Sequence, residues 1–417
     1  GPARTLGKMG WRDKEVYERI VRVTFLCTKG FSMLTIGERD AVNILRFFDD
    51  LPDPRSKVNR LHRLGDVIVI AVCAVIATAD GPTAIASWAK LNEAWLRKHL
   101  SLPNGIPGKD TFRRVLGLLT PAAFQQCFQQ WLESLSVPAD GESGGKTHIA
   151  IDGKAMRRSH DRKNGLGAMH IVSAWASDRG ITLGQVATEE KSNEITAIPQ
   201  LLDLIHVEDA IVTIDAAGCQ KNIAAQIVNG KGDYILALKG NQGKLFDEVR
   251  FLLDCHMRDD FADCPVSRYI EAEEGHGRVE ERLYYQMTAP DYLHGRSEWK
   301  GLKTIGAAVR IYYENGVRKT DTRYFLSSLR RNGKQFANGV RNHWTIENTL
   351  HWSLDMTYRE DESRVRNRTF ANNLSWLRRL SLSLIKQHPG KQSNIMKRRM
   401  AGWSVDFLMQ ILTGKSS

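Results

Sequence analysis

The spacing of hydrophobic residues divides the chain into a helical first part and a mixed second part. Between residues 41 and 136, apolar positions recur at helical spacing, and residues 67–77 form an unbroken apolar run. Trp88, Leu91, Trp95 and Leu96, for example, share one face of a predicted amphipathic helix. The segment 41–136 therefore predicts an all-α N-terminal domain, preceded by an arm of mixed pattern, residues 1–40.

From residue 148 the pattern changes to short apolar runs separated by turn residues and amphipathic helices. A stretch rich in Gly, Ser and acidic residues, 137–147, predicts the linker that precedes it. Residues 148–264 predict elements in the order β-β-β-α-β-α-β-α, which is the order of an RNase H-like α/β fold. Alternating apolar and polar residues predict a β-rich insertion at 265–330, and the segment 331–417 returns to helices.

Two carboxylates follow directly after apolar runs that are expected to be buried strands, where a charge is energetically costly. Asp152 follows the apolar residues 149–151, and Asp215 follows a second apolar run, 210–214. Burying a carboxylate is unfavourable unless it is paired, and a divalent cation is a frequent ligand. The simpler alternative is an Asp that caps the next turn. Two Asp residues at strand ends, together with a Glu on a helix, are what a two-metal phosphoryl-transfer site needs.

The third carboxylate in this interpretation is Glu347, in the predicted helical segment 341–368. Glu347 shares a helix face with Trp344 and His351. Its neighbours Ile346, Leu350 and Trp352 predict a buried setting, whereas the alternatives lie in a stretch typical of an exposed turn. Those alternatives are Glu360, Asp361 and Glu362, with Asp355 as a further candidate ligand.

These stretches, read together, resemble one family. AIDGK (150–154), TIDAAG (213–218) and HWTIENTLHW (343–352), followed by Glu360 and Asp361, resemble bacterial insertion-sequence transposases of the DDE type, in the branch that includes the H-repeat-associated proteins. The resemblance covers residues 47–412. It implies that Asp152, Asp215 and Glu347 are catalytic and hold two Mg²⁺ or Mn²⁺ ions. In related transposases an Arg precedes the Glu and a Lys follows it; here His343 stands at the place of the Arg, and Leu354 and Asp355 stand where the Lys is expected.

Several basic and aromatic residues are candidates for DNA contacts. In the predicted helical domain, residues 109–114 could open a recognition helix or belong to an ordinary bundle helix. Trp299 could stack on an unpaired base or pack in the core. The remaining candidates are Lys154, Lys239, His276, Arg278, Arg282, Arg341, His343, Arg364 and Arg366.

Charge and composition favour a nucleic-acid partner and exclude other classes. The chain of 417 residues carries 59 Lys and Arg against 47 Asp and Glu, and the segment 341–417 carries 13 against 6. This excess favours a polyanion. The six cysteines form no CxxC pair, so we expect free thiols in a reducing cytoplasm rather than structural zinc. The longest apolar run is far shorter than the roughly 20 residues of a membrane span.

We therefore expect a DNA transposase that cuts double-stranded DNA at the terminal repeats of an insertion sequence and joins them to target DNA. By the logic of the family, synapsis of two ends implies a homodimer, acting in the bacterial cytoplasm at the nucleoid. Two alternatives stay open: a metal-dependent nuclease without strand transfer, and a DNA-binding protein descended from a transposase that has lost its chemistry.

Overall fold

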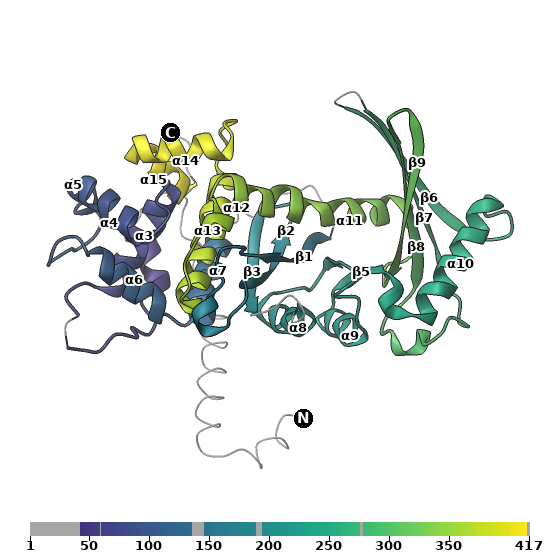
Figure 1. Ribbon diagram of the computed structural model, residues 1–417, viewed down its shortest axis with the longest axis horizontal. Helices are drawn as coiled ribbons and strands as arrows, with labels where there is room; N and C mark the ends of the chain where they lie inside the picture. Colours follow the sequence, from purple (N-terminus) through teal and green to yellow (C-terminus); the bar gives the residue numbers. More distant parts are fainter. Residues whose placement is uncertain (1–41, 59, 136–145, 189–193, 276–277, 415–417) are drawn as a thin grey trace, which may run out of the picture. The chain divides into compact units, whose positions relative to one another are not determined.

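A computed structural model describes residues 42–58, 60–135, 146–188, 194–275 and 278–414. The predicted arm, 1–40, and most of the predicted linker, 137–147, lie outside these residues. Within them the chain is a mixed α/β structure built on one large sheet (Figure 1). No helix of this part of the chain is long and apolar enough to cross a membrane.

The sheet has nine strands in the order β3-β2-β1-β4-β5-β9-β8-β7-β6. Strands β1–β4 and β4–β5 pair in parallel, and every other pair is antiparallel. The bounds are β1 (Thr147–Ala155), β2 (His170–Ala176), β3 (Ile181–Thr188), β4 (Ala210–Ile214), β5 (Asp233–Leu238), β6 (Val266–Gly275), β7 (Arg278–Thr288), β8 (Thr304–Glu314) and β9 (Val317–Ser327). The strands of the predicted β-rich insertion extend the same sheet, because β9 pairs with β5.

Helices cover both faces of the central strands, which explains why β4 is buried along its whole length. On one face, Val212 and Ile214 pack with α8 (Glu194–Leu204), α9 (Lys221–Asn229) and α10 (Lys244–Arg258). On the other face, Ile211 of β4 packs against α11 (Gly333–Thr345). Successive side chains of a strand point to opposite faces, so this one apolar run supplies two hydrophobic cores.

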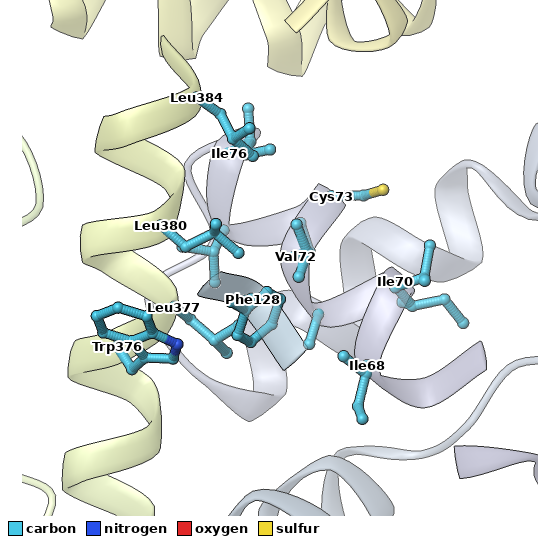
Figure 2. Close-up of a cluster of buried hydrophobic side chains, with 14 of the residues drawn as sticks. Ile68, Ile70, Val72, Cys73, Ile76, Phe128, Trp376, Leu377, Leu380 and Leu384 are labelled. Atoms are coloured by element: carbon cyan, nitrogen blue, oxygen red, sulfur yellow. The ribbon is translucent and has the colours of Figure 1, made fainter. Parts of the chain in front are cut away.

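The N-terminal helices share a core with the C-terminal ones. The apolar run predicted from sequence forms α3 (Leu64–Ile76), which is buried along nearly its whole length and packs against α13 (Arg368–Gln387), as Figure 2 shows. The remaining elements around this core are α2 (Val42–Leu45), η3 (Arg46–Phe48), α4 (Pro82–Leu91), α5 (Glu93–Leu96), α6 (Lys109–Leu118), α7 (Pro121–Leu135), α14 (Asn394–Trp403) and α15 (Val405–Thr413).

One predicted helical face is wrong at a single residue. Leu91 is 87% exposed, whereas Leu96 is buried. The predicted helix is in fact two, because α4 ends at Leu91 and α5 begins at Glu93. Trp88 and Trp95 still lie together, with ring centroids 6.3 Å apart, and both pack against the core that contains Leu96, so only Leu91 departs from the predicted face.

The helix that carries Glu347 crosses the sheet in three parts. It begins with α11, whose first turn is capped by Asn332, the side chain of which accepts a hydrogen bond from the Gln335 amide at 3.0 Å. It continues as a π-helical turn, η8 (Ile346–His351), and ends as α12 (Trp352–Met356). The π-helical turn is the part that contains Glu347.

Candidate catalytic site

Asp152 and Asp215 lie at adjacent positions on neighbouring parallel strands. The parallel pairing of β1 with β4 ends at the pair Ile151–Ile214, so the next residue on each strand is one of the two aspartates. Asp215 leaves β4 and accepts hydrogen bonds from the amides of Ala217, at 3.0 Å, and Gly218, at 3.2 Å. The two carboxylates therefore share the carboxyl edge of the parallel strands, the usual place for a ligand site in such sheets.

β1 is longer than the sequence indicated. Asp152 does not end it: the strand continues to Ala155, and Asp152 itself pairs with Ser173 of β2. This antiparallel pairing holds the backbone of Asp152 after β4 has turned away. At Asp152, β1 is therefore paired with β2 on one side and has no paired strand from the described ranges on the side of β4.

Glu347 brings a third carboxylate to the same edge. Burial and, to a lesser extent, the negative charges of Asp215, Glu347 and Glu194 raise the pKa of Asp152 to about 7. The three predicted carboxylates are therefore close enough to act on one another electrostatically. Glu347 itself is exposed on the helix surface, where an incoming ligand could reach it.

The setting of Glu347 agrees only in part with the prediction. Ile346 and Leu350 are fully buried, but Trp352 is 58% exposed. Trp352 comes two residues after Leu350, which is about 200° around a regular helix, so it lies on the opposite face from the buried Leu350.

Two histidines flank Glu347 on its own helix. His351 is buried, and its Nδ1 lies 3.6 Å from Asp152 Oδ2. Burial lowers the pKa of His351 to about 3, helped by the cations Arg379 and Lys154, so its imidazole is neutral. Its Nε2 is buried and accepts or donates no hydrogen bond within the described structure. Sequence reasoning gave His351 no role, although its position four residues after Glu347 was a signal.

His343, predicted to contact DNA, faces the sheet instead. Its Nδ1 lies 3.2 Å from Thr213 Oγ1 on β4. Burial lowers the pKa of His343 to about 4, against the opposing effect of Asp215, so this imidazole is neutral as well. A neutral, inward-facing ring is poorly suited to bind phosphate, so we do not propose His343 as a DNA contact.

A further acidic residue lies behind the site. Glu194, in the first turn of α8, pairs with His170 of β2, and both side chains occupy the space beside Gly153. A Cβ atom built on Gly153 would collide with both of them. The glycine that follows Asp152 is therefore required by close packing, and substituting it would push β1 away from this pair.

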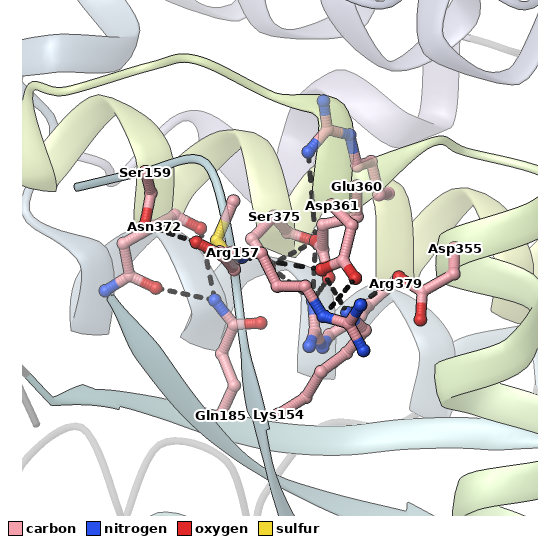
Figure 3. Close-up of polar contacts among 12 residues, drawn as sticks. Lys154, Arg157, Ser159, Gln185, Asp355, Glu360, Asp361, Asn372, Ser375 and Arg379 are labelled. Atoms are coloured by element: carbon pink, nitrogen blue, oxygen red, sulfur yellow. Dashed lines mark hydrogen bonds and ion pairs between the residues drawn. The ribbon is translucent and has the colours of Figure 1, made fainter. Parts of the chain in front are cut away.

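Lys154, predicted to contact DNA, is paired with two carboxylates in this structure. Its side chain is only 8% exposed, and its Nζ lies 2.7 Å from Asp355 and 2.9 Å from Asp361 (Figure 3). Asp361 also pairs with Arg157 at 3.1 Å. The lysine thus ties β1, two residues after Asp152, to the end of the helix that carries Glu347. Because Asp355 pairs with Lys154, we do not assign Asp355 as a metal ligand.

The stretch 360–362 is only partly the exposed turn that the sequence indicated, because Glu362 is exposed but Glu360 is not. Glu360 is completely buried and pairs with Arg379 of α13, which is also completely buried, at 3.1 Å. Ser375 donates a second hydrogen bond to Glu360 at 2.8 Å. These partners lie 15 and 19 residues further along the chain, so local pattern could not reveal them.

Trp299 was predicted either to stack on a base or to pack, and the structure shows packing. The side chain is 2% exposed and lies in the core beneath the sheet. Stacking on a base needs an accessible ring face, which Trp299 lacks.

The other predicted DNA contacts lie at several places. Lys239 is exposed directly after β5, in a loop joined to the Asp215 loop by a hydrogen bond of 2.8 Å from Asn241 to the Ala216 carbonyl. Arg282 pairs with Glu280 at 2.8 Å, and Arg341 lies 3.7 Å from Glu271. Arg364 and Arg366 are exposed, Arg278 begins β7, and His276 lies outside the described residues.

The carboxylates of Asp152, Asp215 and Glu347 suit a divalent cation, although they are not arranged as a complete metal site. Among the described residues, no three His, Cys, Asp or Glu side chains form a ready-made metal cluster. The carboxylate oxygens of Asp152, Asp215 and Glu347 are nevertheless the ligands that Mg²⁺ and Mn²⁺ prefer. Their mutual repulsion at Asp152 is what a dication would relieve.

Comparison with known proteins connects this geometry with a family. Residues 143–384 match the family described as "Transposase DDE domain", and residues 45–132 match the family described as "DDE_Tnp_1-associated". A protein of Escherichia coli O157:H7 named "Putative transposase YncI" is 38% identical over 363 residues, covering 86% of this chain and 90% of its own. The "H repeat-associated putative transposase YhhI" of Escherichia coli K12 is 35% identical, covering 87% and 96%.

Among solved structures, a piggyBac transposase in a synaptic complex with hairpin DNA aligns over 92% of this chain and 83% of its own, with 10% identity and a TM-score of 0.42. The family match spans more than half of the chain and includes all three carboxylates at the sheet edge. The chain belongs to the DDE-domain transposase family.

Proposed function

We propose that this protein cuts double-stranded DNA at the ends of an insertion sequence and joins those ends to target DNA. The observation that carries the proposal is the meeting of Asp152 and Asp215 at the end of the β1–β4 pairing, with Glu347 close enough to act on Asp152. The strand order β3-β2-β1-β4-β5, with β1, β4 and β5 parallel, supports an RNase H-like core for this chemistry.

Asp152, Asp215 and Glu347 would hold two Mg²⁺ or Mn²⁺ ions. When bound, such ions activate the attacking oxygen and stabilise the leaving oxygen in an in-line displacement at phosphorus. The chain's own contribution is to hold the ligands. β2 fixes the backbone of Asp152, the hydrogen bonds from residues 217 and 218 orient Asp215, and Lys154 ties the helix of Glu347 to β1.

His351 has a supporting place in this site. Its neutral ring beside Asp152 adds no positive charge that would oppose a bound cation. An imidazolium at the same position would compete with the cation for Asp152. No covalent intermediate between protein and DNA is needed, so no nucleophilic Ser or Tyr is assigned.

We further propose a homodimer that synapses two DNA ends at the bacterial chromosome. The helical segment 41–136 would help to recognise the end sequence, and Lys239, Arg278, Arg282 and Arg341 would contact DNA near the point of cleavage. Lys239 is the best placed of these, since its loop is bonded to that of Asp215.

The test is cleavage of labelled DNA that carries the element end, in Mg²⁺ or Mn²⁺. The unmodified protein should cut, whereas Asp152→Asn and Glu347→Gln should bind the same DNA without cutting it. Glu362→Gln is the matched control, because Glu362 is an exposed glutamate that pairs with Arg359 and not with the site. Full cutting by Glu347→Gln would reject the assignment of the third carboxylate.

Joined products separate a transposase from a nuclease. If DNA ends are cut but never joined to a second duplex, the narrower activity of a metal-dependent nuclease is correct. If DNA is bound without cutting in either metal, the chain is a DNA-binding protein with inactive chemistry.

A further inference from the structure

A groove on the surface of the helical part joins two segments that are far apart in sequence. It has a volume of about 650 Å³ and lies between α6 and the start of α13. α6 buries Phe112, Val115 and Leu116, so Arg113 and Arg114 are left on its outer face. These two arginines line the groove together with Arg366, which precedes α13, over a floor that includes Leu118 and Phe370.

A basic loop lies next to this groove. The connection between β1 and β2, residues 156–169, carries four exposed cations: Arg157, Arg158, Arg162 and Lys163. The loop is held in place by other groups. Arg368 donates hydrogen bonds to the carbonyls of Ser159, at 3.2 Å, and Gly167, at 2.7 Å. Its exposed cations are therefore presented on a fixed backbone.

The loop and the groove are close in space. Arg368 is the first residue of α13 and binds the loop, and Arg366, two residues earlier, lines the groove. The pKa of Asp161 in the loop is lowered, first by a hydrogen bond from Asn164 and further by the charge of Arg366. The cations thus form one surface, here called the basic track: Arg113, Arg114, Arg157, Arg158, Arg162, Lys163 and Arg366.

Few cations of the track form close ion pairs, although Asp161 and Glu362 act on Arg366 and Arg158 at longer range. Asp110 pairs with Arg113 at 2.9 Å, and Asp361 pairs with Arg157. Within the described part of the chain, no carboxylate lies within ion-pair distance of the other five: Arg114, Arg158, Arg162, Lys163 and Arg366. An excess of arginine on a fixed surface matches phosphate groups, which guanidinium binds with two parallel hydrogen bonds.

We propose that the basic track binds the phosphate backbone of a DNA duplex whose end reaches the carboxylates. This inference rests on the proposed function. It is supported by continuity, because the loop begins directly after β1, and Arg157 is only five residues from Asp152. It also gives the N-terminal helices a contact with DNA through the outer face of α6.

The first experiment measures binding of a fluorescein-labelled duplex of about 30 base pairs and arbitrary sequence at a series of KCl concentrations. The track variant is Arg113→Gln/Arg114→Gln/Arg366→Gln. The control variant, Lys244→Gln/Arg250→Gln/Arg258→Gln, removes the same charge from the exposed surface of α10. Each lost phosphate contact lowers the slope of log affinity against log salt by about one. The track variant should lose about two to three units of slope, and the control less than about one.

Equal slopes for the track and control variants would overturn the proposal. A change in oligomeric state without a change in DNA binding would also overturn it, because the groove would then hold a protein. Hydrogen exchange on the unmodified full chain gives a second measurement that needs no variant. The duplex should slow exchange in residues 109–118 and 156–168, and unchanged exchange in both segments would reject the track.

The two proposals can fail separately. If the unmodified protein binds the duplex through the track but never cuts an element end, the basic track stands and the catalytic proposal fails. If Asp152→Asn abolishes cutting while the track variant binds like the control, the catalytic proposal stands and the track fails.

Discussion

Replacing Arg379 with methionine should be one of the most damaging changes outside the carboxylates themselves. Arg379 and Glu360 are both completely buried, with Arg379 Nη1 lying 3.1 Å from Glu360 Oε1. Arg379 Nε also donates to Ser173 Oγ at 3.1 Å, and Ser173 is the residue of β2 that pairs with Asp152 (Figure 3 shows the arginine among its neighbours). The substitution would leave a buried carboxylate without its nearest cation and would free the strand beside Asp152.

The loss of unfolding free energy depends on the interactions that Glu360 keeps after Arg379 is replaced. Breaking a buried ion pair by removing one member costs about 3–5 kcal/mol of unfolding free energy. Arg378, at 3.8 Å from Glu360, and Ser375, which donates at 2.8 Å, keep part of the stabilisation. We therefore expect the lower end of that range, about 3 kcal/mol.

The assay is urea denaturation followed by circular dichroism and tryptophan fluorescence. The control is Arg97→Met, which breaks a solvent-exposed pair with Glu93 at 2.7 Å and should cost at most about 1 kcal/mol. The double variant Arg379→Met/Glu360→Met should recover part of the loss, because the buried carboxylate is removed together with Arg379, although the buried Arg378 then loses Glu360 as well. If Arg379→Met were no more destabilising than Arg97→Met, the reasoning from a buried charge pair would be refuted.

Three further predictions concern pH, metal and the tryptophans. The pKa of Glu360 is lowered, because Arg379, Arg378 and Lys154 outweigh the effect of burial. The ionised Glu360 therefore stabilises the folded state above the ordinary pKa of 4.5, and this contribution is lost as pH falls through the lower folded-state pKa. Urea midpoints of the unmodified protein and of Glu360→Gln should therefore differ at neutral pH and converge in acid, and a constant gap would contradict this. Mn²⁺ should raise the melting temperature of the unmodified protein but not that of Asp152→Asn, and an equal rise in both would place the cation elsewhere. Trp299→Ala should cost about 3–5 kcal/mol by urea denaturation, and Trp352→Ala about 1 kcal/mol or less, because only the first ring is buried.

Local pattern was sufficient for the two aspartates. An apolar run that ends in a carboxylate is a property of neighbouring residues, and both Asp152 and Asp215 come at such ends. The helix of Glu347 and the buried α3 were accessible for the same reason, since spacing along the chain determines which residues share a helix face.

The errors arise where a distant residue determines the environment. Lys154 reads as a free cation beside Asp152, but its carboxylate partner Asp361 lies 207 positions along the chain. Trp299 reads as an available aromatic ring until the sheet and its helices enclose it. Spacing cannot predict such pairings, because they are created by the packing of α13 and the sheet rather than by the local backbone.

The π-helical turn at 346–351 has a consequence for how this family can change by insertion and deletion. A regular helix advances about 100° per residue, so removing one residue from this turn would rotate α12 by about that angle relative to α11. α11 would still pack on the sheet through Phe336, while His351 and Leu354 would leave Asp152 and the core. A substitution in this turn changes one side chain, whereas the deletion of one residue would misalign α12 with α11. Within this turn, chain length should therefore be constrained as well as the identities of Glu347 and His351.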